Sequence, residues 1–273
     1  ECRAVLMENG EILDFLMERS TEGEGKVPQV GDIFKGIVLR VTKYGDTSVI
    51  LSAYTELFGL QQYIVKGVRT TSKKGANKAV YYQPAAILQM EVYHTPMKAM
   101  QMVKEVSWDY VYQNVYSDVL RNAVALYIVE VLQQTMQPEP HPEMFYLIED
   151  TFKQLDKGGA GLVSNLPIYF LIHLSQTMGF GLQGKYSNET PILDIKEGEF
   201  VSKPPAHPYY LEAQTAQVAS TFLAVQFYND LETISLSGAQ RKKILELFQL
   251  SLSWHYKKFS EIKSLPILQS ILH

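Results

Sequence analysis

"IFKGIVLRVTKYGDTSVILSAYT" spans residues 33–55 and decides the fold that the sequence predicts. Two runs rich in Val, Ile and aromatic residues flank the turn residues Tyr44-Gly45-Asp46, which is the pattern of a β-hairpin. Three further runs of this kind follow at residues 58–68, 84–94 and 100–113. Five short strands in about eighty residues predict a small closed β-barrel, such as an OB-fold.

The sequence pattern changes on both sides of this barrel. Upstream, Asn9-Gly10 separates two runs of alternating apolar and polar residues, which predicts a hairpin, and residues 20–32 read as a polar connector. After residue 113, apolar residues recur at helical spacing. We expect helices at residues 116–136, 141–159, 165–181, 209–232 and 237–259, three of them starting near Ser117, Pro142 and Ser237.

The sequence therefore predicts an α+β protein, with an N-terminal OB-fold β-barrel followed by an all-helical domain. The expected boundaries are an extension at residues 1–35, the barrel at 36–113 and the helical domain at 114–273. Residues 182–208 form a small insertion with many turn residues and two short β-like pieces, "PILDI" and "EFVS". Two domains are an ordinary number for a chain of 273 residues.

The sequence lacks the motifs of several classes of chemistry. The single cysteine, Cys2, excludes an internal disulfide and a thiolate zinc site. The histidines are scattered, and no Gly-x-Ser-x-Gly elbow or complete phosphate-binding loop is present. There is no apolar run of about 18 residues and no visible signal peptide. We therefore expect a cytoplasmic protein that needs no metal or cofactor, and a single cysteine fits a reducing cytosol.

Positive charge is concentrated in the predicted barrel. Residues 36–104 carry nine Lys and Arg against three Asp and Glu, whereas the whole chain has a net charge of −4. Single-stranded nucleic acid is bound by cations along its backbone and by aromatic rings on which bases stack. The basic cluster and the tyrosines in or beside this block are Lys66, Arg69, Lys73, Lys74, Lys78, Tyr44, Tyr63, Tyr81 and Tyr82. The combination predicts a nucleic-acid-binding face, while a solvated surface and tyrosines that pack across strands are the ordinary alternatives.

An ordered set of motifs in residues 36–84 resembles the start of the bacterial RecO family of recombination mediators. The motifs are a Gly-Ile-Val-Leu strand at 36–39, the Tyr-Gly-Asp turn at 44–46, Thr55 with Gly59, Lys-Gly-Val-Arg at 66–69, and Gln83-Pro84. The resemblance continues through the helices and covers about residues 36–273.

The resemblance implies that the chain binds single- and double-stranded DNA without being an enzyme, and that it anneals complementary strands. It also implies RecR and the single-stranded-DNA-binding protein as partners in loading the RecA recombinase. By position, the DNA-facing surface would comprise Arg40, Lys43, Lys66, Arg69, Lys73, Lys74 and Lys78.

Two segments depart from the family pattern. Many RecO proteins carry a four-cysteine zinc finger where residues 182–208 here contain no cysteine. We expect its turns and strands to persist without metal around a small apolar core of Tyr186, Ile192, Leu193 and Phe200. The first thirty-five residues resemble the start of the ribonuclease E/G family, but no nuclease activity is implied, because the metal-binding aspartates of that family are not here.

The last predicted helix offers a second candidate surface. Trp254, Lys257, Lys258 and Lys263 could bind an acidic, apolar peptide such as the tail of the single-stranded-DNA-binding protein, although an ordinary amphipathic helix with solvated lysines has the same pattern. Two rival functions remain for the whole chain. One is an RNA-binding barrel linked to RNA processing, and the other is an adaptor that contacts only proteins.

Overall fold

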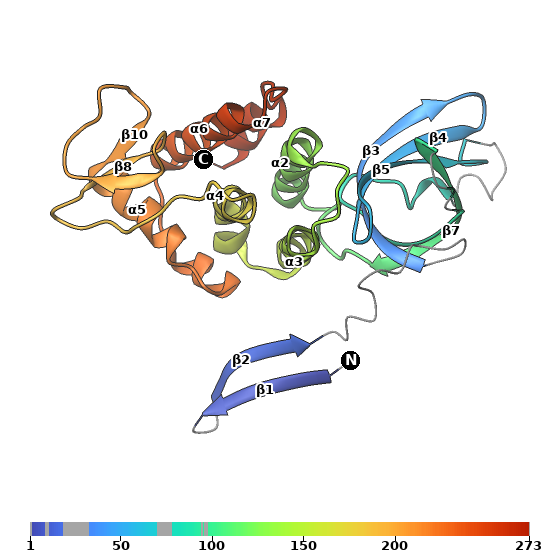
Figure 1. Cartoon of the computed structure of the whole chain (residues 1–273), viewed down its shortest axis with the longest axis horizontal. Helices are drawn as coiled ribbons and strands as arrows, with labels where there is room; N and C mark the ends of the chain where they lie inside the picture. The colour runs from blue at the N-terminus through green and yellow to red at the C-terminus, as the bar shows by residue number, and fades with distance from the viewer. Residues whose placement is uncertain are drawn as a thin grey trace.

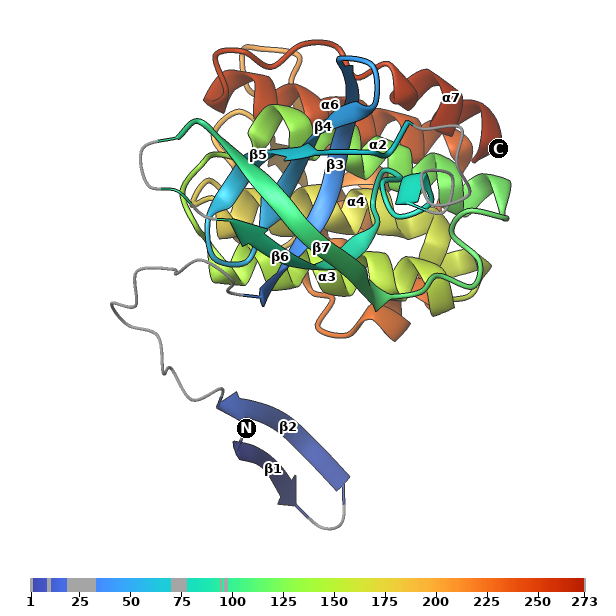
Figure 2. The ribbon, with the colours of Figure 1, turned by 90° about the vertical axis from the view of Figure 1, so that its right-hand side faces the viewer.

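The computed structural model describes residues 2–8, 11–18, 33–69, 78–93, 95 and 98–272. Figure 1 shows the β-barrel at one end of the long axis and the small sheet with β8 and β10 at the other, with the helices between them. Figure 2 looks onto the barrel, with β7 crossing in front and the helices behind. The expected order, barrel first and helices second, is confirmed.

Five strands close the barrel in the order β3-β4-β5-β7-β6. They are β3 (Ile33–Tyr44), β4 (Ser48–Thr55), β5 (Gly59–Val65), β6 (Ile87–Tyr93) and β7 (Met100–Tyr110). All neighbouring strands are antiparallel except β5 and β7, which run parallel. A small closed five-stranded barrel is the architecture of the predicted OB-fold. β3 begins at Ile33, inside the segment that the sequence assigns to the extension.

Alternating side chains fill the barrel. Val38, Leu51, Tyr63 and Leu88 are almost fully buried, and they come from four different strands. The intervening residues point outward, because successive side chains of a strand lie on opposite faces. Each of the five barrel strands lies within or close to a run that the sequence predicts.

The helical domain contains more elements than the five predicted helices. They are α2 (Val119–Thr135), α3 (Pro142–Lys157), α4 (Ala160–Thr177), α5 (Ala213–Leu223), the 3-10 helix η1 (Tyr228–Thr233), α6 (Gly238–His255) and α7 (Ser264–Ile271). Pro142 starts α3 and Ser237 caps α6 as predicted. The start of α2 was predicted one residue early, because Asp118 rather than Ser117 accepts the hydrogen bond from the Arg121 amide.

The expectation of one helix across residues 209–232 is wrong. Residues 210–212 pair with β8 as strand β10, so their backbone groups are used by a sheet. A second break follows α5, and η1 then packs on α4. There Tyr228 contacts the ring of Tyr169, and the Asn165 amide donates to the carbonyl of Leu231 at 2.8 Å. Helical periodicity alone does not reveal which backbone groups a sheet will use.

The insertion is a three-stranded sheet without a cysteine. β8 (Ile192–Asp194) pairs with β9 (Glu199–Val201) on one side and with β10 (Tyr210–Glu212) on the other, so both predicted β-like pieces are strands. Ile192 and Leu193 are buried, and Tyr186 and Phe200 are partly buried against the helical core. The apolar core that was expected to replace the metal is therefore present.

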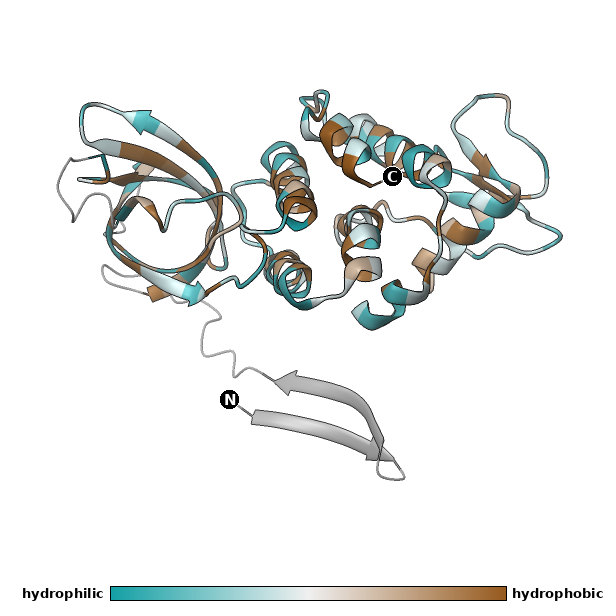
Figure 3. Ribbon diagram, turned by 180° about the vertical axis from the view of Figure 1, so that it is seen from behind, coloured by the Kyte–Doolittle hydropathy of each residue, from teal (hydrophilic) through white to brown (hydrophobic). Residues whose placement is uncertain are grey.

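At the start of the chain, β1 (Cys2–Glu8) and β2 (Glu11–Glu18) pair in antiparallel register, as the alternating pattern predicts. The Asn9-Gly10 turn and the connector at 20–32 lie outside the described residues. Figure 3 shows hydrophobic residues on the faces that the helices turn toward one another. No helix in the described part of the chain has the length and apolar character to cross a membrane.

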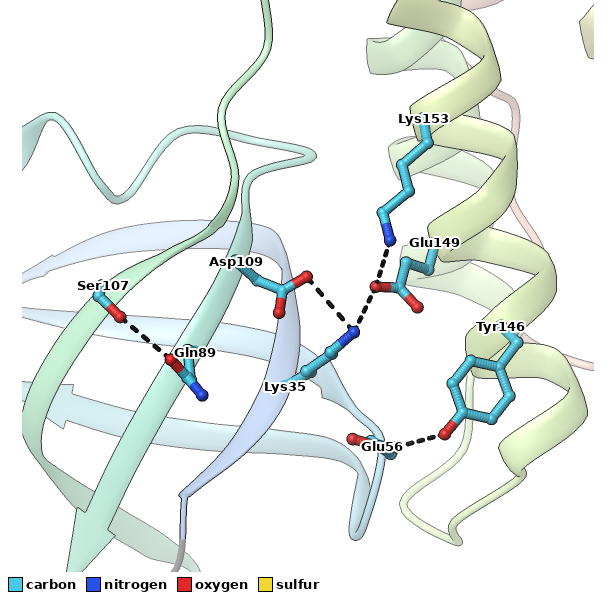
Figure 4. A network of polar contacts seen from close by, with 8 residues as sticks. All are labelled: Lys35, Glu56, Gln89, Ser107, Asp109, Tyr146, Glu149 and Lys153. Atoms are coloured by element: carbon cyan, nitrogen blue, oxygen red, sulfur yellow. Dashed lines mark hydrogen bonds and ion pairs between the residues drawn. The ribbon is translucent and has the colours of Figure 1, made fainter. Parts of the chain in front are cut away.

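A polar network joins the barrel to the helices (Figure 4). Glu149 of α3 is almost fully buried and accepts hydrogen bonds from Lys35 of β3 and Lys153, each at 2.8 Å. Lys35 also lies 3.4 Å from Asp109 of β7. Burial would raise the pKa of Glu149, but the two ammonium groups outweigh it and hold that pKa below its ordinary value. The network fixes the barrel's orientation on α3.

Asp156 makes a second connection, between α3 and the segment that leaves the barrel. Its buried carboxylate accepts the backbone N–H groups of residues 113–115 at 2.7–3.1 Å. Gly59 makes a third, since its φ is +62° and a Cβ there would lie 2.2 Å from the carbonyl oxygen of Glu139. These contacts hold the two domains together at several points.

Candidate nucleic-acid interface

The turn between β3 and β4 is attached to the segment that follows β5. The Arg69 guanidinium donates to the carbonyl of Gly45 at 2.9 Å, and the Arg69 amide donates to the carbonyl of Thr47 at 2.9 Å. Lys43 and Tyr44 stand exposed beside this turn. Residues that the sequence separates by more than twenty positions therefore meet at one edge of the barrel.

A cleft of about 420 Å³ opens next to this edge. β5 and β7 are paired over only three positions, in which Gln62 lies opposite Met100 and Ile64 lies opposite Met102. The two strands then separate, and residues beyond this pairing line the cleft. Lys66, Lys78 and Tyr81 all contribute to its wall. Both lysines are exposed, and the Tyr81 ring is held against Trp108 with 4.9 Å between ring centroids. The structure thus brings together three residues that the sequence predicts for a DNA-binding face.

Tyr82 also borders the cleft, but it is only 7% exposed, and its ring belongs to the barrel core. Its burial raises the pKa of its hydroxyl to about 12. Other predicted residues lie elsewhere. Arg40 lines a separate groove of about 570 Å³ between the barrel and α2, together with Lys263. Lys73 and Lys74 lie outside the described residues.

The cleft also contains residues that the sequence analysis missed. Tyr93 and Met102 line it and are 43% and 37% exposed, and Lys104 is an exposed third lysine. Glu91 forms an ion pair with Lys104, and this hydrogen bond raises the pKa of the lysine. The signal that could have identified Tyr93 and Met102 is the pairing register of β6 and β7. In that register the two residues lie directly opposite each other on the outer face of the barrel.

The cleft has acidic as well as basic groups. Glu105 lines it, and Asp46 is exposed in the β3–β4 turn. The described cations of the edge still outnumber these carboxylates. They are Lys43, Lys66, Arg69, Lys78 and Lys104. Such a surface suits a polyanion bound through its backbone.

The second candidate surface lies at the end of α6 and in the loop that follows it. Trp254 is 40% exposed and packs edge-on against Tyr209, which precedes β10, with 5.3 Å between ring centroids. Lys257 and Lys258 are exposed in the loop after α6. The backbone amide of Lys263 donates to Glu130 of α2 at 2.9 Å. Trp254 and Lys263 therefore have different neighbours.

The described residues contain no group of three or more His, Cys, Asp or Glu side chains that could hold a metal ion. The charged edge and its cleft are the candidate site in the described part of the chain.

Comparison with known proteins gives two family matches. Residues 33–111 match the family described as "Recombination protein O N terminal", and residues 116–266 match "Recombination protein O C terminal". The matches correspond closely to the barrel and to most of the helical domain.

Similar curated proteins carry the name of the same family. A DNA repair protein RecO from Christiangramia forsetii is 27% identical over 87% of this chain and 97% of its own length. The proteins of that name from Phocaeicola vulgatus and Porphyromonas gingivalis are 26% and 23% identical, over 86% and 88% of this chain and 97% and 98% of their own lengths. The predicted family is confirmed, and the chain belongs to the recombination protein O (RecO) family.

Proposed function

We propose that this protein acts in DNA repair as a recombination mediator that binds single- and double-stranded DNA without sequence preference. In this role it anneals complementary strands and helps to load the RecA recombinase onto DNA coated by the single-stranded-DNA-binding protein, with RecR as a partner. The site of action would be the bacterial cytoplasm, at the nucleoid.

The observation that carries the proposal is the cationic edge of the barrel, formed by Lys43, Lys66, Arg69, Lys78 and Lys104. Lysine and arginine contacts to phosphates position nucleic acid without reading its sequence. Neutralising phosphates also reduces repulsion between two strands held on the same surface, which favours annealing. The helical domain is opposite in charge to this surface, because residues 114–273 carry 12 basic and 16 acidic side chains.

The test is charge reversal at three exposed lysines of the cationic edge. Lys43→Glu, Lys66→Glu and Lys78→Glu together should weaken binding to an oligonucleotide at least about 100-fold at low salt and slow annealing in parallel. Arg69 is left unchanged, because its guanidinium also supports the β3–β4 turn.

A matched control makes the same change of charge at the other end of the molecule. Lys185, Lys196 and Lys203 are exposed in the insertion, far from the barrel in Figure 1. Their replacement by Glu should leave DNA affinity within about threefold, since screening limits charge effects to about 10 Å. Equal losses in both triple variants would mean that only net charge matters, and the barrel edge would then not be the DNA-binding face.

One further comparison separates the proposal from its rivals. Single-stranded DNA and RNA of equal sequence should compete on equal or DNA-favouring terms. A strong preference for RNA would instead support an RNA-processing role, and absence of binding to either would support an adaptor that contacts only proteins. For the partner peptide, the proposed surface remains Trp254, Lys257, Lys258 and Lys263, and the backbone amide of Lys263 is bonded to Glu130 of α2.

A further inference from the structure

The cleft beside β7 combines exposed apolar side chains with lysines. Tyr93 and Met102 face each other across β6 and β7, so their side chains lie on the same face of the barrel. Tyr81 contributes a second ring, which packs against Trp108. Lys66 and Lys78 also line the cleft and are exposed. A volume of about 420 Å³ is within the ~300–1,000 Å³ range of small-ligand sites.

We propose that this cleft takes one unpaired nucleotide of single-stranded DNA, with the base against Tyr93 and Met102 and the phosphates at Lys66 and Lys78. The proposal rests on the proposed function and deepens it, since it names the form of DNA that the cleft selects. The argument for this occupant is complementarity, with cations for the backbone beside an apolar wall for the base.

A duplex cannot use the same wall. Inside a duplex each base is stacked on both faces and paired along one edge, and extruding it requires the energy of unstacking and unpairing. Duplex DNA would therefore meet only the cations of the edge. The cleft would act as a selector that favours single strands, while the lysines bind both forms.

The experiment compares Tyr93→Ala with Tyr93→Phe by fluorescence anisotropy. The probes are a labelled 20-nucleotide oligothymidine and a labelled duplex of about 20 base pairs. Because a base–aromatic stack is worth ~1–3 kcal/mol, Tyr93→Ala should weaken single-strand binding about 5- to 150-fold and leave duplex binding within twofold. Tyr93→Phe keeps the ring and should keep the affinity. Met102→Ala should show a smaller loss in the same direction.

A strand of abasic sites serves as the second probe, because it keeps the phosphates and removes the bases. The wild-type protein should bind it more weakly than oligothymidine, whereas Tyr93→Ala should bind both alike. Equal loss on single strand and duplex, or no loss on either, would overturn the proposal while leaving the DNA-binding function intact. Failure of the wild-type protein to bind any DNA would overturn the function itself. Since Tyr93 is 43% exposed, its truncation should leave the melting temperature unchanged.

Discussion

Replacing Glu149 with Gln tests how the barrel is fixed to the helices. The Glu149 carboxylate is 3% exposed and accepts hydrogen bonds from two ammonium groups at 2.8 Å (Figure 4). Glutamine keeps the size of the side chain and removes its charge. Lys35 would then retain only Asp109, at 3.4 Å. The substitution therefore weakens the polar network that joins β3, β7 and α3.

The size of the effect follows from two ammonium groups that lose a charged acceptor. Each hydrogen bond of this kind is worth ~1.5–3 kcal/mol, and removing one partner of a buried pair costs ~3–5 kcal/mol. Lys35 and Lys153 are 24% and 28% exposed, so water can partly replace the carboxylate. We expect the free energy of unfolding to fall by about 2–3 kcal/mol at neutral pH.

The loss should depend on pH with a definite sign. The pKa of Glu149 in the folded protein lies below its ordinary value of 4.5, so unfolding takes up a proton between these two values. The carboxylate's contribution is complete above 4.5 and disappears as the pH falls through the folded-state pKa. The difference between wild type and Glu149→Gln should therefore be constant above about pH 5 and shrink below it.

Urea denaturation followed by circular dichroism at several pH values measures both quantities. Glu143→Gln is the matched control, because Glu143 lies exposed in the first turn of the same helix and should cost less than about 1 kcal/mol. If Glu149→Gln is no less stable than Glu143→Gln at pH 7, the network does not hold the domains together.

Two further predictions concern the same junction. Asp156→Asn should lower the free energy of unfolding by about 2–4 kcal/mol in urea denaturation, because three backbone N–H groups lose their charged acceptor; an unchanged midpoint would contradict this. Gly59→Ala should cost at least about 2 kcal/mol more than Gly45→Ala. Both glycines have a positive φ, but only at Gly59 would a Cβ clash with a backbone carbonyl, so equal melting temperatures would refute the close contact.

The barrel could be predicted from sequence because its information is local. Each strand carries its own alternation of apolar residues, and the turn residues at 44–46 mark a hairpin directly. The helix starting at Pro142 and the cap at Ser237 are local signals of the same kind. Local patterns failed across residues 209–232, where pairing with β8 overrides helical periodicity.

The candidate site was only partly predictable for the same reason. A run of basic residues is visible in the sequence, so Lys66 and Lys78 were found. Whether a tyrosine faces solvent or the core depends on packing, and Tyr82 is buried while Tyr93 is exposed. The junction depends on pairs as far apart as Lys35 and Glu149, which are 114 residues apart and carry no local signal.

The most direct test of the central proposal is the salt dependence of single-strand binding. The logarithm of the binding constant falls linearly with the logarithm of salt concentration, by ~0.7 for each phosphate contact on a single strand. The triple variant of Lys43, Lys66 and Lys78 should therefore show a slope that is shallower by about 2 than wild type, while the insertion triple variant keeps the wild-type slope. An unchanged slope in the barrel variant would mean that these lysines touch no phosphate, and would contradict the proposed DNA-binding face.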